Sequence, residues 1–301
     1  MEPQQNAAFG TLGTLGTSGT CMRRLPVLAL VLFAGLSVAA CDIKTSANGD
    51  LSFDISGGKA VDTWSRTYKI PATGRFELIN VNGRITAEPT DGNEVIVEGR
   101  RTAKARSDEQ AKEQLAKMEI REEVGDSTVR VESRPPRFNG GFSGHEIEWT
   151  IKVPKGVTVD LRTVNGGVRL NGLSGDIFAK TTNGGVHGMG IIPSKIEAQS
   201  VNGGVEFELA SPLDETDSVQ LETVNGGAEL SLAQESKATI TARCVNGGVK
   251  VDGLEISKED QSNDFEKRRR LNGTMNGGGA RVTMSTTNGG IRLYKIGSKT
   301  S

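Results

Sequence analysis

The chain has 301 residues, and 36 Lys and Arg against 37 Asp and Glu give it a formal net charge of −1 at pH 7. This balance argues against a nucleic-acid-binding protein, which needs an excess of positive charge to neutralise phosphates. Aromatic residues make up only 4% of the chain, which argues against an enzyme that stacks sugars on aromatic rings.

A secretory signal is predicted over residues 22–40. It begins with Met22-Arg23-Arg24, continues in an apolar run from Leu25, and ends in small residues before Cys41. Val38-Ala39-Ala40-Cys41 resembles the bacterial lipobox, which implies that Cys41 is lipidated and becomes the first residue of the mature protein. An ordinary signal peptide or a membrane helix is the alternative, but the run is shorter than the roughly 20 residues that cross a bilayer.

The residues around this signal are expected to lie outside the folded domain. Residues 1–21 are of low complexity, and we expect translation to start at Met22. Residues 41–62 are polar and predict a tether. Asp42 resembles a signal that retains lipoproteins in the inner membrane. Because Cys41 carries lipid in this interpretation, only Cys244 remains in the mature chain, and no intrachain disulfide is expected.

Residues 63–296 are predicted to form one domain, with an insertion at residues 98–145 and a tail at 297–301. In the insertion, Ser107 can cap a helix that we expect near residues 107–119. Strands that extend a sheet are expected at three segments with alternating polarity, residues 94–97, 128–132 and 146–153. Residues 134–144 are expected to form a loop.

A repeated Asn-Gly-Gly motif follows the insertion. Steps of 18, 19, 23, 21 and 42 residues separate its copies, and a looser Asn-Gly-Arg copy begins at Asn82. A period near 20 is typical of stacked repeats. The asparagines expected to form a ladder at the corners are Asn82, Asn165, Asn183, Asn202, Asn225, Asn246 and Asn288.

Aligning the copies on Asn separates buried from exposed positions. Positions 6 and 4 before Asn, and 3 and 5 after it, are almost all apolar, whereas the positions between them are polar or mixed. Alternation with a period of two on both sides predicts two strands in each repeat, with Asn-Gly at the corner. Two positions before Asn, every Asn-Gly-Gly copy has a small residue, and Cys244 occupies this column as an expected buried residue.

We therefore predict an all-β fold, a single-chain β-solenoid of stacked rungs with two short strands each and one helix in the insertion. Asn-Gly also occurs in two-residue hairpins, so an antiparallel meander or barrel is the alternative. A solenoid explains why the same small residue precedes every corner, since equivalent residues of successive coils lie above one another. Asn and Gly also tolerate the left-handed backbone that a sharp corner can require.

Residues 257–279 are expected to be a loop before the last rung. They include Lys267-Arg268-Arg269-Arg270, which could attract anionic lipid or simply lie in water beside the acidic residues that precede it.

The lipobox, the first strand pair around Val81-Asn82-Gly83, the helical insertion and the Thr-x-Asn-Gly-Gly repeats together resemble the bacterial β-solenoid domains of unknown function called putative adhesins. The resemblance covers roughly residues 60–296 and implies an exported or membrane-attached protein. It brings no catalytic residues. Many relatives have Asp at the second Gly of the motif, whereas this chain has Gly almost throughout, so we expect no metal at the corners.

No catalytic set, cofactor or metal site is predicted. His145 and His187 lie far apart in sequence and are expected on the surface. A polysaccharide lyase would need acidic and basic side chains on adjacent rungs. The residues that could supply them on outward columns are Asp160, Glu197, Glu206, Glu208, Glu222, Glu229, Arg162, Lys180 and Arg243. A sheet face that is exposed to water also carries side chains of both charges, so these residues alone do not indicate an active site.

The sequence thus predicts a non-enzymatic protein anchored through Cys41, facing the periplasm or the cell surface, whose polar surface contacts an envelope or surface protein. The alternatives are an inner-membrane sensor or scaffold subunit, a structural spacer, and more remotely a polysaccharide-active enzyme.

Overall fold

The computed structural model describes residues 42–45, 51–54, 57–135, 144–258 and 268–297. Cys41 and the predicted signal lie outside the described residues. The chain divides into two compact units, residues 1–55 and 56–301. In the first, β1 (Asp42–Thr45) pairs antiparallel with β2 (Leu51–Asp54). The expected tether at 41–62 therefore contains a strand pair, and its last residues already belong to β3.

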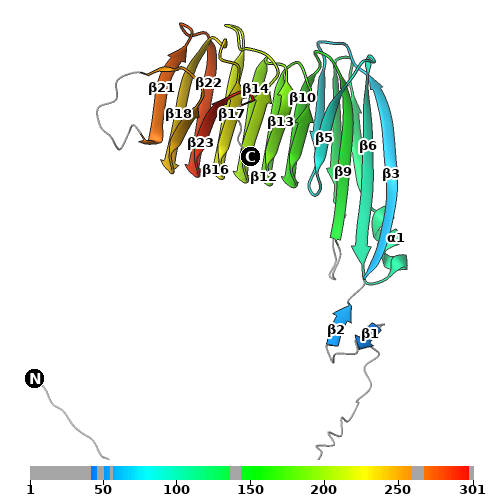
Figure 1. The fold of residues 1–301 in the computed structure, drawn as a ribbon. Helices are drawn as coiled ribbons and strands as arrows, with labels where there is room; N and C mark the ends of the chain where they lie inside the picture. The colour runs from blue at the N-terminus through cyan, green and yellow to red at the C-terminus, as the bar shows by residue number, and fades with distance from the viewer. Residues whose placement is uncertain (1–41, 46–50, 55–56, 136–143, 259–267, 298–301) are drawn as a thin grey trace, which may run out of the picture. The chain divides into compact units, whose positions relative to one another are not determined.

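Over the residues that the structure describes, the second unit is all-β, with two large sheets and one helix, and neither sheet closes into a barrel (Figure 1). The eleven-stranded sheet contains, in order, β20 (Ser257–Lys258), β21 (Arg270–Met275), β18 (Ala238–Asn246), β22 (Ala280–Asn288), β16 (Ser218–Asn225), β14 (Lys195–Asn202), β12 (Ile177–Asn183), β10 (Thr158–Asn165), β4 (Arg75–Ile79), β8 (Thr128–Arg134) and β7 (Glu119–Val124). The ten-stranded sheet contains β19 (Val249–Asp252), β23 (Ile291–Lys295), β17 (Ala228–Leu232), β15 (Val205–Leu209), β13 (Val186–Ile191), β11 (Val168–Asn171), β5 (Ile85–Thr90), β9 (Gly144–Pro154), β6 (Glu94–Ala105) and β3 (Gly58–Lys69).

The two strands of each repeat lie in different sheets, and each pairs in parallel with the equivalent strand of a neighbouring repeat. For example, Val159 of β10 pairs with Ile177 of β12, and β11 pairs with β13. The Asn-Gly corner therefore does not join two hydrogen-bonded antiparallel strands, and the hairpin alternative is wrong. The column alignment of the sequence matches the register of these pairs.

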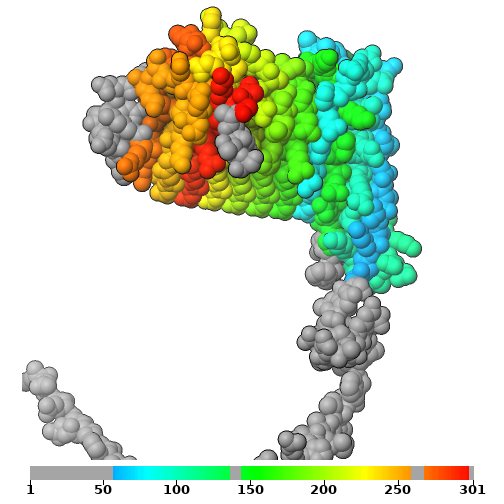
Figure 2. Space-filling model, in the orientation of Figure 1, coloured from blue at the N-terminus to red at the C-terminus, as the bar shows by residue number. Residues whose placement is uncertain are grey.

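The repeats are not stacked in chain order. Strands β22 and β23, the last pair along the chain, lie between the β16/β17 pair and the β18/β19 pair. In Figure 2 the red C-terminal segment accordingly lies between the yellow and the orange segments. Because the inward columns of all copies are alike, either order would bury the same side chains, and the sequence pattern could not distinguish them.

The segment at residues 257–279, expected to be a loop, contains two strands. β21 pairs antiparallel with β18, and the two-residue β20 pairs antiparallel with β21. In this way β21 covers the edge that β18 would otherwise leave open. The expectation of a loop failed because residues 270–275 carry no motif and are rich in polar residues.

The insertion at residues 98–145 also belongs to the sheets. It contains the second half of β6, the helix, β7, β8 and the start of β9. The predicted helix is confirmed as α1 (Asp108–Ala116), where Ser107 is the N-cap and its hydroxyl accepts from the Gln110 backbone N–H. The expected strands around it are confirmed as parts of β6, β8 and β9.

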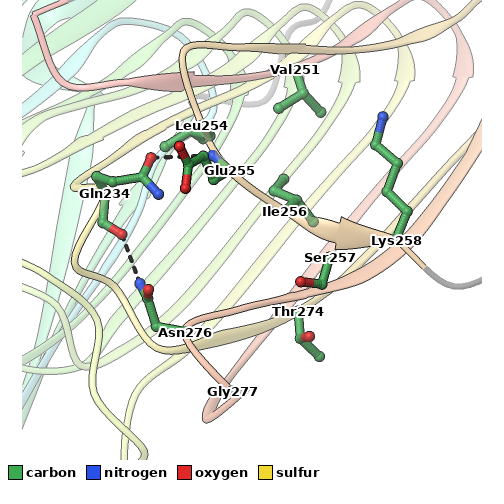
Figure 3. Close-up of a pocket in the computed structure, with 10 residues that line it drawn as sticks. All are labelled: Gln234, Val251, Leu254, Glu255, Ile256, Ser257, Lys258, Thr274, Asn276 and Gly277. Atoms are coloured by element: carbon green, nitrogen blue, oxygen red, sulfur yellow. Dashed lines mark hydrogen bonds between the residues drawn. The ribbon is translucent and has the colours of Figure 1, made fainter.

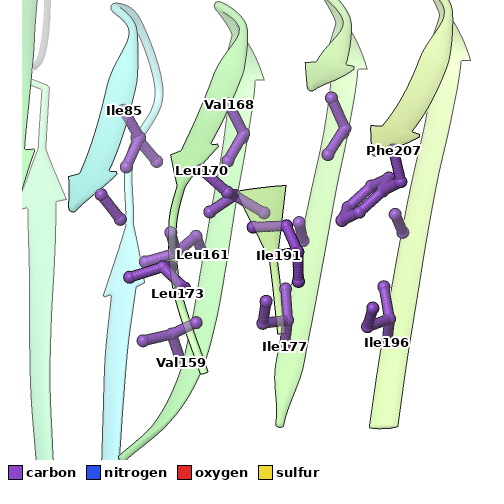
Figure 4. Packing of buried hydrophobic residues seen from close by; sticks show 14 of the residues in the cluster. Ile85, Val159, Leu161, Val168, Leu170, Leu173, Ile177, Ile191, Ile196 and Phe207 are labelled. Carbon is purple, nitrogen blue, oxygen red and sulfur yellow. The ribbon is translucent and has the colours of Figure 1, made fainter. Parts of the chain in front are cut away.

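The core lies between the two sheets and is filled by the inward columns (Figure 4). Leu161, Leu170, Ile196 and Phe207 are among its fully buried side chains. Burial alternates along most repeat strands, as in the pattern from Ser218 to Asn225, because successive side chains point to opposite faces. The outward faces of both sheets therefore carry the polar and charged columns.

Candidate functional site

The asparagines of the corners form one continuous row. In each of six links the side-chain Nδ2 of one Asn donates to Oδ1 of the Asn in the neighbouring repeat, over 2.7–2.9 Å. Their order in space is Asn82, Asn165, Asn183, Asn202, Asn225, Asn288 and Asn246. All six links point the same way, and the row ends where Nδ2 of Asn82 lies 3.0 Å from Nε2 of His145.

The glycine after each of these asparagines is required by close approach of the backbone. A Cβ at Gly203 would overlap the carbonyl oxygen of Gly184 in the neighbouring repeat, and the same holds for Gly184 against Gly166. Among the described non-glycine residues only Asn276 has a positive φ. The corner asparagines are thus not left-handed, and the conformational reason given for them from the sequence is wrong.

The small column two positions before Asn has a bonding role that the sequence analysis missed. The hydroxyl of Thr223 donates to the carbonyl of Gly203 over 2.7 Å, and Thr181, Ser200 and Thr286 make the equivalent bond over 2.8 Å. The recurrence of Thr and Ser at a buried position was the available signal, since a buried hydroxyl needs a partner. Cys244 takes this position in β18 and is buried there, and burial raises the pKa of its thiol.

A group of charged side chains covers the outward face of the eleven-stranded sheet over β4, β10, β12 and β14. Asp160 is only 2% exposed, because Arg75 and Arg162 cover it. Arg162 donates to both of its carboxylate oxygens, over 2.8 and 2.7 Å, and Nη2 of Arg75 donates to Oδ2. The hydrogen bonds to Asp160 raise the pKa of Arg162 above its usual value.

This network continues along the face. Nε of Arg75 lies 2.8 Å from Oε1 of Glu77, and Arg130 on β8 lies 3.6 Å from Glu77 and 3.8 Å from Glu132. The side chains of three strands, β10, β4 and β8, are thus tied into one sequence of alternating charges. Such networks hold long side chains in place more firmly than isolated surface pairs do.

Phe178 is the aromatic side chain of this outward face. The guanidinium of Arg75 lies 4.9 Å from its ring centroid, and the ammonium of Lys195 lies 5.0 Å from it. A shallow hollow of about 240 Å³ adjoins the ring. Its lining residues are Asp160, Arg162, Phe178, Ala179, Lys180, Glu197 and Gln199. Lys180 lines this hollow and is exposed, and it forms no ion pair with the described residues.

The nine charged residues considered for a lyase converge only in part, because four of them line the hollow beside Phe178, namely Asp160, Arg162, Lys180 and Glu197. Glu206, Glu208 and Glu229 lie on strands of the ten-stranded sheet, and the other six lie on the eleven-stranded sheet. Both oxygens of Asp160 are held by arginines, so this carboxylate is not placed to move a proton. Over the described residues, no three His, Cys, Asp or Glu side chains are grouped closely enough to hold a metal ion.

The two histidines also lie apart. His187, on β13, is 3.4 Å from Glu206. His145, expected on the surface, is half-buried in β9, and burial lowers its pKa. No pattern in the sequence indicates its bond to Asn82, because the two residues are 63 positions apart. None of the helices that the structure describes is long and apolar enough to cross a membrane.

Comparison with known proteins finds similar solved structures only. No family model matches the chain, and no curated protein matches it. The chain is similar to a putative cell adhesion protein from Clostridium sporogenes, with a TM-score of 0.41, 14% identity, and coverage of 78% of this chain and 100% of the other. It is also similar to a putative adhesin from Bacteroides fragilis, with a TM-score of 0.40, 11% identity, and coverage of 78% and 97%. These neighbours carry the name of the domain family that the repeats resemble.

Proposed function

We propose that this chain is a lipid-anchored β-solenoid protein of the bacterial cell envelope. It acts without catalysis, as an adhesin-like surface for a protein or another envelope component. In this proposal each rung of about 20 residues contributes one strand to each sheet. The parallel, in-register pairing between repeats supports the solenoid, since a meander would pair neighbouring strands of one hairpin.

The charged network around Asp160 and Phe178 is the observation that carries the contact function. Its side chains are held in place before any partner arrives, which lowers the entropic cost of binding. Polar surfaces of this kind give specificity through complementary charge. The row of buried columns beneath it serves as a rigid support.

The contact is tested by photo-crosslinking in the native envelope. A photoreactive amino acid at position 180, beside the hollow, is expected to capture a discrete partner. The matched control is the same amino acid at position 169, an outward site of the ten-stranded sheet. Capture at both positions alike, or at neither, would favour a structural spacer over a contact surface.

The anchor is a separate part of the proposal and rests on the lipobox at Cys41. Cys41→Ser is expected to release the mature protein from the membrane fraction, whereas Cys244→Ser should leave it attached. Fractionation of the native strain also addresses the inner-membrane sensor or scaffold that Asp42 suggests. Recovery of the Cys41-dependent form in the outer membrane would remove that alternative.

The absence of catalysis is tested directly on polysaccharides. Purified mature protein is expected to leave them intact with and without divalent metal ions. Cleavage that is lost when Glu206 and Arg243 are replaced would show the proposal to be wrong.

A further inference from the structure

A column of polar side chains crosses the outward face of the eleven-stranded sheet beside the Phe178 hollow. It consists of four register partners on the neighbouring strands β10, β12, β14 and β16, in the order Arg162, Lys180, Gln199 and Glu222. The column therefore begins with two cations, continues with a neutral amide and reaches its first anion at Glu222.

The two cations of this column are not balanced alike. Arg162 uses Nε and Nη2 to bind the carboxylate of Asp160, whereas Lys180 forms no ion pair with the described residues. Like charges directly opposite each other on adjacent strands are destabilising. A carboxylate placed beside both side chains would relieve the repulsion between them.

The anion of the column is held in position by neutral groups. Gln199 and Gln220 each donate to one carboxylate oxygen of Glu222, over 3.2 and 2.8 Å. In the described part of the chain Glu222 forms no ion pair, so these amides fix the carboxylate without neutralising its charge. The column thus offers one place for an anion, at Lys180, and one for a cation, at Glu222.

The distance between these two places restricts what can contact both of them. Lys180 and Glu222 are two strands apart, and neighbouring strands lie about 4.8 Å apart, so a ligand that contacts both spans about 10 Å. In a polyproline II segment every third residue faces the same side, and a rise of about 3.1 Å per residue separates such residues by about 9 Å. An acidic and a basic residue three positions apart in such a segment match the column.

The hollow beside Lys180 adds an apolar contact next to these charges. Phe178 is half-buried in its lining and lies two positions before Lys180 on the same outward side of β12. The hollow of about 240 Å³ is smaller than the pockets that enclose whole small molecules, but it leaves room for one side chain. Aromatic side chains are the usual contacts of proline rings in polyproline II recognition.

A uniformly negative ligand fits this face less well. An acidic polysaccharide would be attracted by Arg162 and Lys180, but it would also place negative charge on Glu222. Lys195, the next cation on this face, is already paired with Glu197 over 3.0 Å. Charge complementarity therefore favours a protein segment that carries both signs.

We propose that the column from Arg162 to Glu222 binds a polyproline II segment of a partner protein, with an acidic and a basic residue three positions apart. The acidic residue contacts Arg162 and Lys180, the basic residue contacts Glu222, and a proline beside the acidic residue packs against Phe178. This inference rests on the proposed contact function of the same face and specifies the chemistry of the partner.

A second hollow supplies a matched control residue. It has a volume of about 620 Å³ and lies between the segment from Leu254 to Lys258 and the segment from Thr274 to Gly277 (Figure 3). Lys258 is exposed in its lining, as Lys180 is in the smaller hollow, but no aromatic ring is among the described residues that line it. The strand that carries Lys258, β20, lies four strands from β16 in the sheet.

The test is an NMR titration of the mature protein in detergent with the capped peptide Pro-Glu-Pro-Pro-Lys-Pro, up to about 5 mM. Backbone amide signals of residues 178–182 and 220–222 are expected to shift. The isomeric peptide Pro-Pro-Glu-Lys-Pro-Pro has the same composition, but its two charges face different sides of the segment. It should therefore bind at least about fivefold more weakly.

Charge reversal tests the two ends of the column separately. Lys180→Glu should weaken binding of the first peptide at least about fivefold and should favour Pro-Lys-Pro-Pro-Lys-Pro. Glu222→Lys should weaken it to a similar extent and should favour Pro-Glu-Pro-Pro-Glu-Pro. The control Lys258→Glu makes the same change of charge as Lys180→Glu and should alter neither affinity nor preference.

Three outcomes would overturn this inference. The first is no shift at residues 178–182 and 220–222, and the second is equal affinity for the two isomeric peptides or for the charge-reversed variants. The third is tighter binding of an oligogalacturonate, strengthened further by Glu222→Lys, since the face would then belong to an acidic polysaccharide. Photo-crosslinking distinguishes this failure from that of the contact function. Capture of a partner protein at position 180 but not at 169 would keep the contact function and remove only the polyproline segment.

Discussion

The repeat strands from β10 onward and the layer that precedes them, β3 to β9 with α1, stabilise the same two sheets in different ways. In the repeats the same contacts recur from one repeat to the next. Asn donates to Asn, and Thr or Ser donates to the carbonyl of a glycine. Every new repeat can therefore be added by the same contacts. The regularity that makes the repeat visible in the sequence is also what holds it together.

The preceding layer depends on contacts between unlike residues. Trp64 packs edge-on against Trp149 at a centroid distance of 5.6 Å, and the hydroxyl of Tyr68 donates to Glu122 over 2.6 Å. Burial, followed by the bond to Glu122, raises the pKa of Tyr68 above its usual value. Asn80, at the small-column position of the first copy, donates to two carbonyls and accepts from Ser133. Each of these contacts occurs once, so no repeated pattern in the sequence predicts it.

The largest change in the free energy of unfolding is expected at an inward residue of a repeat strand, and the outward residue beside it is the control. Leu221→Ala should reduce the free energy of unfolding by about 2 to 4 kcal/mol, because Leu221 is fully buried and its truncation leaves a cavity. Glu222→Ala, one residue further and outward, should cost under about 0.5 kcal/mol. Urea unfolding of both variants measures this, and equal losses would contradict the register of β16.

The next largest change in stability is expected when one of the two glycines of a corner is replaced and the other serves as the control. Gly203→Ala should destabilise by about 1–3 kcal/mol, because the new Cβ would overlap the carbonyl oxygen of Gly184. At Gly204 a Cβ would lie 3.4 Å from the carbonyl oxygen of Gly227, an ordinary contact. Gly204→Ala is therefore the matched control and should stay within about 1 kcal/mol of the unchanged protein in the same unfolding measurement. Similar losses at both positions would mean that close stacking does not select glycine here.

The comparison also explains which features could be predicted from the sequence. The register of the repeats followed from column alignment, and α1 followed from Ser107 and the acidic residues after it, because both signals are local. The place of β22 between β16 and β18 could not be predicted, since equal columns allow either order. The Phe178 ring lies against Arg75 and Lys195, which come from strands that are far apart in the sequence, and only the stacking brings them together.

A smaller effect is expected at the one Asn-Gly-Gly repeat that departs from the Thr or Ser column. Cys244→Thr should stabilise the protein by about 0.5–1 kcal/mol, because a hydroxyl there can donate to the carbonyl of Gly289 as Thr286 does to that of Gly226. Thr223→Cys is the reciprocal variant and should destabilise by a similar amount. Thermal unfolding of both is the measurement, and a loss of stability in Cys244→Thr would show that this position does not share the bonding of its column.

The smallest effect is expected at the end of the asparagine row in the preceding layer, at the bond between Asn82 and His145. Burial lowers the pKa of His145, so the folded protein binds fewer protons at this site than the unfolded chain, whose histidine titrates near about 6.5. The stability contributed by the neutral ring is thus fully present above that pH and is lost as the pH falls through and below it. His145→Gln keeps an acceptor for Asn82 but does not titrate. The difference in urea midpoint between pH 7.5 and 5.5 should therefore be smaller in this variant than in the unchanged protein. The same pH dependence in both would mean that the end of the asparagine row does not sense protonation of His145.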